Sequence, residues 1–444
     1  MSFSSTGSGQ PRRRRRVLLP TLLILAALVT VFVVFSGFYT DWLWFQSVGK
    51  GQVFTTTLMV KVGMFAVFGL IMGVVLGAFM WLAWRTRPES VAFTPEQASL
   101  ERYRTGLERY RRGLTIGLCV VVGFFAGLTA AGEWSTYLLW RNSTPFDIID
   151  PQFGLDISFY TFTLPFIRFL IGFAFSLIII CFLAVVVVQY LYGGLRLQPK
   201  GDRASGAAQS QLSFLIALFL LTKAVAYWFD RFGLATQSQT LVPGFTGLKY
   251  TDVYAVLPAL NILTVVAVLV AVLFLLNCFR RHWVIPVIGA GLMIVSAVVV
   301  GTLYPLFVQQ FQVRPSELVK EQPYIDRNIQ ATRTAYAVAN AEMKDYAGTV
   351  DPPTASVVQA SAGTLNNIRL LDPAVVSPTY NQLQQIRGYY SFNARLDVDR
   401  YPIDKAMRGA VVAVREVNLP GIPDSQRNWT NDHAVYTHGY GFVA

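Results

Sequence analysis

Seven long apolar runs constrain this chain more than any other feature of its sequence. About 20 helical residues, at 1.5 Å per residue, cross the ~30 Å hydrocarbon core of a bilayer. The predicted spans cover residues 17–39, 62–84, 114–137, 164–192, 212–229, 256–278 and 283–308. Charged residues make up only 14% of the chain, against about 25% of an average soluble domain. A soluble globule is therefore excluded. The sequence predicts a multi-pass α-helical membrane protein with a seven-helix transmembrane domain over residues 17–308.

The positions of lysine and arginine orient these spans. Seventeen basic residues lie before the first span and in the loops after the second, fourth and sixth spans, whereas four lie in the opposite loops. Positive charge is retained on the cytoplasmic side of a membrane. We therefore expect a protein of the cell membrane with a basic cytoplasmic tail over residues 1–16 and an extracytoplasmic region over residues 309–444.

The net charge of +12 suggests nucleic acid as a candidate partner. Most of the positive excess lies in the predicted cytoplasmic loops, where it faces anionic headgroups of the lipid bilayer. The residues after Gln309 carry 13 basic and 13 acidic side chains, which leaves no basic domain for a polyanion. No nucleic-acid partner is expected.

The first apolar run is interpreted as a retained anchor and not as a cleaved signal peptide. It is 23 residues long and lacks a small-x-small cleavage site after it.

The region after the last span reads as α+β. Its first feature is a one-face helical pattern over residues 325–346, formed by Ile325, Ile329, Thr332, Tyr336, Ala339, Met343 and Tyr346. A short helix is predicted over residues 380–387, strands over 391–398 and 410–417, and a candidate third strand over 434–437. Either the last strand-like segment is tucked into a sheet or the chain is a piece of something longer. The second is favoured, because three strands would leave sheet edges unpaired, so the region is expected to be incomplete.

Several long sequence blocks together resemble one protein family. The blocks are SGFYTDWLWFQSVG, FDIIDPQFGLDISFYTFTLPF, YTDVYAVLPALNIL, RNIQATRTAYAV, VREVNLPGIPDSQRNWTND and YTHGYG. They are similar to an uncharacterised (UPF-type) family of large bacterial, mainly actinobacterial, integral membrane proteins. The resemblance implies seven N-terminal transmembrane helices and a large extracytoplasmic region, in proteins about twice as long as this chain. It implies no established activity.

Few residues of the chain suggest catalysis or metal binding. His433 and His438 are five residues apart, a spacing that shares neither a helix face nor a strand face, so a zinc pair of the HExxH kind is excluded. All three cysteines lie in predicted spans: Cys119, Cys181 and Cys278. There they are expected to behave as small apolar side chains rather than as disulfides or metal ligands. We expect no enzyme activity, no catalytic residues, no cofactor and no metal.

Charged residues within the spans indicate a candidate functional site more clearly than the histidines and cysteines do. Five lie in the predicted outer halves of the spans or at their edges: Lys61, Glu133, Arg168, Lys223 and Asp230. Each costs a few kcal/mol if it faces lipid. One interpretation is an outward-facing polar pocket or ion path, which would make these five a binding site. The other is that the long side chains reach the headgroups and the acids mark span ends.

Two further segments carry structural predictions. Gly69, Gly73 and Gly77 form GxxxG steps, which predict close helix packing within the bundle, with an oligomer contact as the alternative. The segment DPQFGLDISFYTFTLPF, residues 150–166, is acidic and aromatic. It predicts a re-entrant or surface-lying element whose acids face water and whose rings pack under the external region.

Two classes of function follow, with a third in reserve. The leading expectation is a non-enzymatic scaffold or assembly factor of the cell envelope, which presents its external region to a protein, lipid or polysaccharide partner. The alternative is a transporter or lipid-handling protein that uses the outward polar cluster. The third is a membrane enzyme whose site lies beyond residue 444.

Overall fold

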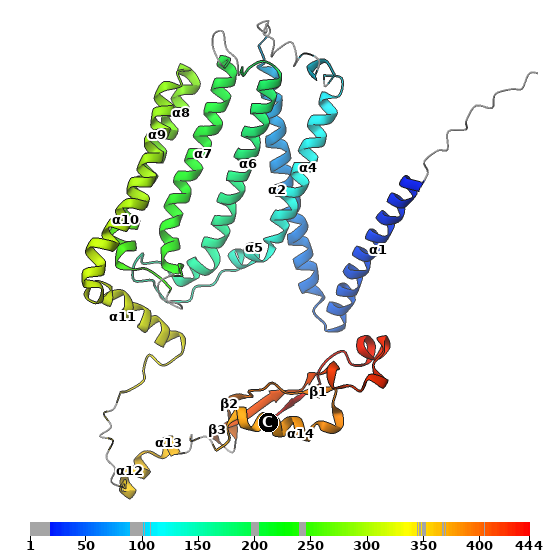
Figure 1. Cartoon of the computed structure of the whole chain (residues 1–444), viewed down its shortest axis with the longest axis vertical. Helices are drawn as coiled ribbons and strands as arrows, with labels where there is room; N and C mark the ends of the chain where they lie inside the picture. The colour runs from blue at the N-terminus through cyan, green and yellow to red at the C-terminus, as the bar shows by residue number, and fades with distance from the viewer. Residues whose placement is uncertain are drawn as a thin grey trace, which may run out of the picture. The chain divides into compact units, whose positions relative to one another are not determined.

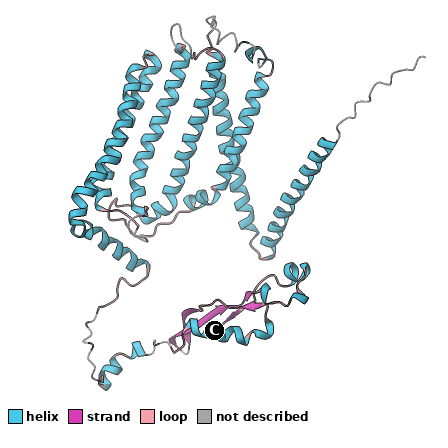
Figure 2. Ribbon diagram, in the orientation of Figure 1, coloured by secondary structure: helices cyan, strands magenta, loops and turns pink. Residues whose placement is uncertain are grey.

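The computed structural model describes residues 18–88, 101, 103–106, 108–196, 204–238, 246–343, 345, 348, 352–365, 368, 370–403 and 405–444. Its contacts divide the chain into two units, Met1–Ala341 and Glu342–Ala444. The described part of the first unit consists mainly of long helices, and that of the second of short helices and short strands (Figure 2).

Long helices form most of the first unit. They are α1 (Leu18–Ser47), α2 (Gly51–Arg85), α4 (Arg111–Gly132), α6 (Leu164–Leu191), α7 (Gly206–Gly233), α8 (Leu257–Arg280) and α9 (Val284–Val298). The short α5 (Trp134–Arg141) follows α4, and α9 continues through α10 (Tyr304–Phe307) and irregular helical turns into α11 (Glu317–Ala335). Among the described residues, seven helices are long and apolar enough to cross a membrane. The predicted number of spans is thereby confirmed at the level of length and composition.

The helices of the first unit run alternately in opposite directions (Figure 1). The C-terminal ends of α2, α6 and α8 therefore meet the N-terminal ends of α4, α7 and α9 at one end of the unit. We call this the basic end, because Arg85, Arg111 and Arg280 lie there at helix termini. The helix termini that flank the predicted basic loops thus share one end, as alternating spans require.

Glycines bring α2 and α4 into backbone contact. A Cβ atom on Gly69 would lie 2.8 Å from the carbonyl oxygen of Gly123, and one on Gly123 would lie 2.7 Å from that of Gly69. A Cβ on Gly73 would lie 3.1 Å from the carbonyl oxygen of Cys119. The predicted GxxxG packing within the bundle is confirmed. Small residues at the crossing let the helices approach closely where lipid supplies no hydrophobic drive for association.

Proline explains the irregular turns that precede several helices. Pro165, Pro258 and Pro305 are each the second residue of α6, α8 and α10, respectively. A π-helical turn precedes each of these helices: Phe159–Thr163, Asp252–Val256 and Val299–Leu303. Proline has no N–H to donate, and its ring clashes with the carbonyl four residues earlier. A locally wider turn accommodates both effects without ending the helix.

The second unit has a small mixed core. Its elements are α12 (Ala355–Ala360), α13 (Ala362–Leu365), α14 (Pro373–Leu383), β1 (Tyr390–Ser391), β2 (Asp397–Ile403), β3 (Ala406–Val414), β4 (Glu416–Val417) and β5 (Phe442–Val443). Strands β2, β3 and β5 form an antiparallel sheet in that order, and β1 pairs with β4. Phe392, Leu396 and Ala413 form the buried cluster, with the ring of Tyr380 against Phe392.

The helix predicted over residues 325–346 is shifted toward the N-terminus and overlaps the prediction over residues 325–335. Helix α11 begins at Glu317 and ends at Ala335, with Tyr336 as its C-cap residue. Ala337 has a positive φ of 56°, a left-handed conformation that ends the helix, so the pattern residues Ala339 and Met343 lie beyond it. Tyr346 lies outside the described residues.

Four further predictions for the second unit needed correction. The helix predicted over 380–387 is α14, which starts earlier because Asp372 caps it by accepting a hydrogen bond from the N–H of Ala374 at 2.9 Å. The strand predicted over 391–398 is shifted, since the hairpin turn at Lys405 pairs residues 397–403 with 406–412. The strand predicted over 410–417 is divided between β3 and β4. The candidate strand over 434–437 is wrong: residues Asn431–Val435 form a helical turn, and the third strand of the sheet is β5.

Candidate functional site

The five predicted charged residues do not contact one another. The Nζ atom of Lys61 lies 5.3 Å from the ring centroid of Trp134, and that of Lys223 lies 4.2 Å from the ring centroid of Tyr227. Both are cation–π geometries. Within the described chain, no hydrogen bond or ion pair joins any two of the five. Each charge therefore has its own local environment.

The remaining three lie near helix ends. Glu133 follows α4 and accepts a hydrogen bond from the hydroxyl of Thr136 at 2.7 Å. The Arg168 guanidinium packs against Gly233, where a side chain would collide with it. Asp230 is exposed near the end of α7. These placements match long side chains and acids at the edge of a membrane, and any function of the five stays a prediction.

Neutral polar side chains, which the sequence analysis passed over, connect the helices inside the bundle. Gln189 of α6 donates to the side-chain oxygen of Gln211 on α7 at 3.1 Å, and Gln211 donates to the carbonyl oxygen of Phe79 on α2 at 2.9 Å. Asn277 of α8 donates to the hydroxyl of Ser213 on α7 at 2.8 Å. Gln and Asn in or beside the apolar runs are the sequence signal for these contacts.

A junction forms at the end of the first unit opposite the basic end. It joins the loop before α8 to α11, the polar C-terminal part of the last candidate span, Val284–Ala335. The backbone N–H of Tyr250 donates to Oε2 of Glu321 at 3.0 Å, and Lys320 donates to the hydroxyl of Tyr250 at 3.2 Å. The Lys320 Nζ atom also lies 4.6 Å from the centroid of the Tyr250 ring. Thr251, one residue on, donates to the side-chain oxygen of Gln309.

Two more contacts extend this junction along α11. Arg327 donates to the side-chain oxygen of Gln152 at 3.1 Å, and Asn328 donates to the carbonyl oxygen of Thr246 at 2.8 Å. Gln152 and Thr246 belong to the two loops that precede α6 and α8. A cleft of about 210 Å³ lies between these loops and α11. We use the name loop–helix junction for the contacts of Gln152, Thr246 and Tyr250 with α11.

Glu321 is the buried acid of the loop–helix junction. Only 8% of its surface is exposed, and its Oε1 atom has no hydrogen-bond partner among the described residues. Burial raises the pKa of Glu321, and the hydrogen bond from Tyr250 opposes that rise. Helix α11 is rich in charged residues, so the burial comes from packing on the loops.

The acids of the segment 150–163 have a different role from the one predicted. The Oδ2 atom of Asp150 accepts hydrogen bonds from the N–H groups of Gln152 and Phe153 and from the hydroxyl of Tyr160. Asp156 accepts from the N–H of Ser158 at 2.8 Å. Hydrogen bonds from Ser158 hold the pKa of Asp156 down, at about 2. The acids therefore fix a tight turn instead of facing water only.

The rings of the same segment pack on the bundle. The Phe153 and Phe159 rings lie 5.1 and 5.3 Å from that of Phe232, and Tyr160 is buried. The segment is a turn followed by the first turn of the fourth candidate span, and its predicted re-entrant or surface-lying place in the membrane stays a prediction. Its contact with α11 through Gln152 supports the predicted coupling between the bundle and the chain that follows it.

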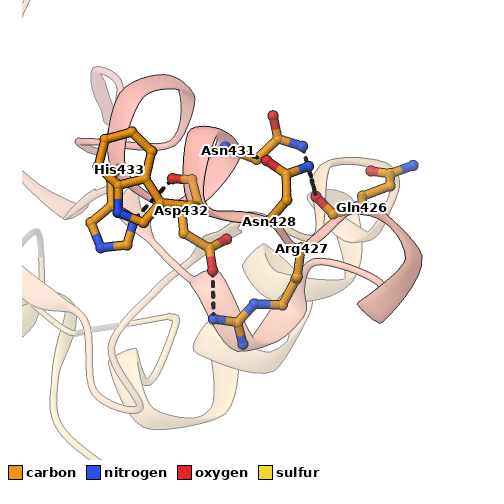
Figure 3. A network of polar contacts seen from close by, with 7 residues as sticks. Gln426, Arg427, Asn428, Asn431, Asp432 and His433 are labelled. Carbon is orange, nitrogen blue, oxygen red and sulfur yellow. Dashed lines mark hydrogen bonds and ion pairs between the residues drawn. The ribbon is translucent and has the colours of Figure 1, made fainter.

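A polar network occupies the loop before β5 in the second unit (Figure 3). Arg427 forms an ion pair with Asp432 at 3.0 Å. Asn431 donates to the carbonyl oxygen of Gln426 at 2.6 Å. Both contacts span five residues and close the loop on itself.

The two histidines of this region each have a local partner. Nδ1 of His433 lies 2.9 Å from the carbonyl oxygen of Trp429, and the two rings stack. Nδ1 of His438 lies 2.9 Å from the hydroxyl of Thr437. Within the described ranges, no group of three or more His, Cys, Asp or Glu side chains is arranged to hold a metal ion.

Comparison with known proteins identifies relatives along almost the whole chain. The sequence profile of the Uncharacterised protein family (UPF0182) matches residues 18–444. A UPF0182 protein of Streptomyces coelicolor is 48% identical over 438 residues, which cover 98% of this chain and 44% of that protein. One of Frankia casuarinae is 46% identical over 97% of this chain and 42% of that protein. One of Thermobifida fusca is 43% identical over 100% of this chain and 43% of that protein.

The chain spans less than half the length of these curated relatives. No solved structure matches it. The names of these relatives state no activity, substrate or partner. The comparisons thus identify the family and leave the function to be argued from the molecule.

Proposed function

The chain belongs to the UPF0182 family, which is uncharacterised, and we propose that it is a multi-pass protein of the cell membrane that acts as an envelope scaffold or assembly factor. In this proposal the seven candidate spans cross the bilayer and the basic end faces the cytoplasm. Helix α11 and residues 342–444 then lie on the extracytoplasmic side, where they present a surface to a protein, lipid or polysaccharide partner.

The loop–helix junction carries this proposal. If the last span were the sole connection between the bundle and the region that follows it, that region could change its orientation relative to the bundle. Here Tyr250, Gln152 and Thr246 bind α11 at three places along its length. The start of the external region is therefore fixed to two loops of the bundle. A fixed exit is what a platform for a partner needs, because a preorganised surface loses less conformational entropy on binding.

The transport alternative has less support. It depended on a shared polar site formed by the five charged residues in the spans. Lys61 and Lys223 instead lie on separate aromatic rings, and Arg168 packs on a glycine. The polar groups that do meet inside the bundle are neutral amides and hydroxyls, which hold no charge to exchange with an ion or proton.

Affinity purification of the full-length protein in mild detergent, followed by mass spectrometry, tests the proposal. Wild type and the exposed-surface control Arg333→Ala should recover a stoichiometric envelope partner. Arg327→Ala together with Asn328→Ala should recover less of it, since both remove contacts of the loop–helix junction. A protein that recovers no partner, and whose thermal stability rises with a transported solute, would contradict the scaffold proposal and favour transport.

A further inference from the structure

A pocket of about 290 Å³ opens at the basic end between α2, α4 and the end of α6. Its polar wall includes Arg111 and Arg112, and its aromatic wall includes Trp84 and Tyr192. The remaining lining side chains, such as Ile116 and Val188, are mostly apolar. The pocket therefore combines cationic and apolar lining side chains, and it lies where the helices end.

Arginine side chains gather on the aromatic rings of this pocket. The guanidinium carbon of Arg111 lies 3.5 Å from the Trp84 ring centroid. That of Arg87 lies 4.7 Å from the same centroid and 5.3 Å from that of Tyr192. Arg104 donates twice to the carbonyl oxygen of Leu191, at 3.1 and 3.0 Å. Stacking and hydrogen bonds hold planar guanidinium groups in place, which prepares them to bind phosphate.

The charges of the pocket are not balanced within the described chain. Arg87 is paired with Glu108 at 3.1 Å. Arg111 and Arg112 form no ion pair with any residue that the structure describes. Helix α4 begins at Arg111 without a side-chain cap, so its first N–H groups and its positive dipole end add to the field. Trp84 also has a buried indole N–H, which has no hydrogen-bond partner among described residues. Together these groups favour an anion.

An apolar groove continues from the pocket toward the middle of the bundle. The groove has a volume of about 820 Å³ and lies between α2 and α4, over Gly69, Gly73 and Gly123. Thr115 and Ile116 line both the pocket and the groove, so the two are continuous. From residue 115 to Phe124, the helix rises about 14 Å at 1.5 Å per residue. That length is close to half of the ~30 Å hydrocarbon core, or one leaflet.

We propose that the pocket and the groove together bind one anionic phospholipid. Arg111 and Arg112 hold its phosphate beside Trp84, and an acyl chain lies in the groove between α2 and α4. A free phosphate ion would use the pocket alone and leave the groove unexplained. A zwitterionic phospholipid would bring a cationic headgroup to the arginines. The site requires only that one bilayer leaflet surround the basic end. This proposal is therefore independent of the proposed scaffold function.

Thermal stability of the full-length protein in nanodiscs tests this site. The discs contain phosphatidylcholine with or without phosphatidylglycerol, and inorganic phosphate is added in a separate arm. Phosphatidylglycerol should raise the melting temperature saturably, and phosphate alone should not reproduce the shift. Arg111→Gln should weaken the apparent affinity for phosphatidylglycerol by roughly tenfold or more, because it removes one charge-assisted phosphate contact. Arg280→Gln, at the basic end but outside the pocket, should leave it unchanged.

The groove has its own matched pair of variants. Ile116→Trp places a ring where the pocket meets the groove, and should abolish the effect of phosphatidylglycerol. Leu118→Trp, on the same helix but outside the groove lining, should keep it. Equal effects of the two lipids, equal losses in Arg111→Gln and Arg280→Gln, or a full shift with inorganic phosphate would each overturn the phospholipid site. A lipid effect that survives Ile116→Trp would overturn the acyl-chain groove.

Discussion

The backbone N–H of Tyr250 donates to Oε2 of Glu321 across 3.0 Å, which joins the loop before α8 to α11, the polar end of the last long candidate helix. These residues are 71 positions apart in the chain. The bond directs a buried carboxylate at a backbone donor. It fixes α11 to the first unit, and its acceptor, the Glu321 carboxylate, is a titratable group.

The buried acid predicts a pH dependence of stability. Burial raises the pKa of Glu321 above its ordinary value of 4.5, so the folded protein holds the proton more tightly than the unfolded chain. The stabilising contribution is complete below pH 4.5 and is lost as pH rises through the folded-state pKa. Glu321→Gln should flatten the melting temperature over that window in detergent. Asp326→Asn, an exposed change on the same helix, should keep the wild-type curve, and an unchanged curve in Glu321→Gln would contradict the assignment.

The far contacts of α11 predict a protease phenotype. Arg327→Ala removes the hydrogen bond to Gln152 and should release the end of α11 from the loop. We expect faster cleavage close to Ala335 in limited proteolysis of the detergent-solubilised protein. Arg333→Ala removes a charge from the same helix without loss of a loop contact. Equal cleavage rates in the two variants would show that the loop contact does not hold the helix.

The crossing of α2 and α4 predicts a size limit at Gly123. Gly123→Ala places a methyl group 2.7 Å from the carbonyl oxygen of Gly69, so the helices must separate. Overpacking of this kind costs about 1–3 kcal/mol, and the melting temperature should fall. A Cβ on Gly117 of the same helix meets no atom within 4 Å. Gly117→Ala should therefore leave stability unchanged or slightly higher, and a similar loss in both variants would argue against a specific crossing.

The buried amides predict energetic coupling between α6 and α7. Gln189→Leu and Gln211→Leu each break the hydrogen bond between these residues and leave one amide without its partner. The double variant removes both groups, so its loss of stability should be smaller than the sum of the single losses. A double-mutant cycle should give a coupling of about 0.6–2 kcal/mol, the range for polar contacts inside membranes. Additive losses would contradict the contact.

The spans could be predicted from sequence because hydrocarbon thickness sets the length of each apolar run. The strands of the second unit were misplaced because the register depends on the hairpin at Lys405, which periodicity does not reveal. Glu321 was missed because its partner Tyr250 is close only in space. Lys61 and Lys223 were predicted to share a polar site because they are charged, but each lies on an aromatic ring. The neutral side chains of Gln189 and Gln211 form an interhelical contact instead.

Residue accessibility in intact cells tests the central claim, that α11 and the second unit lie outside while the basic end faces the cytoplasm. Replacing Cys119, Cys181 and Cys278 permits single cysteines at Val375, which is 71% exposed on α14, and at Arg280, which ends α8. A membrane-impermeant maleimide should label Val375→Cys in intact cells and Arg280→Cys only after permeabilisation. Labelling of Arg280→Cys in intact cells, with Val375→Cys protected until permeabilisation, would contradict the account.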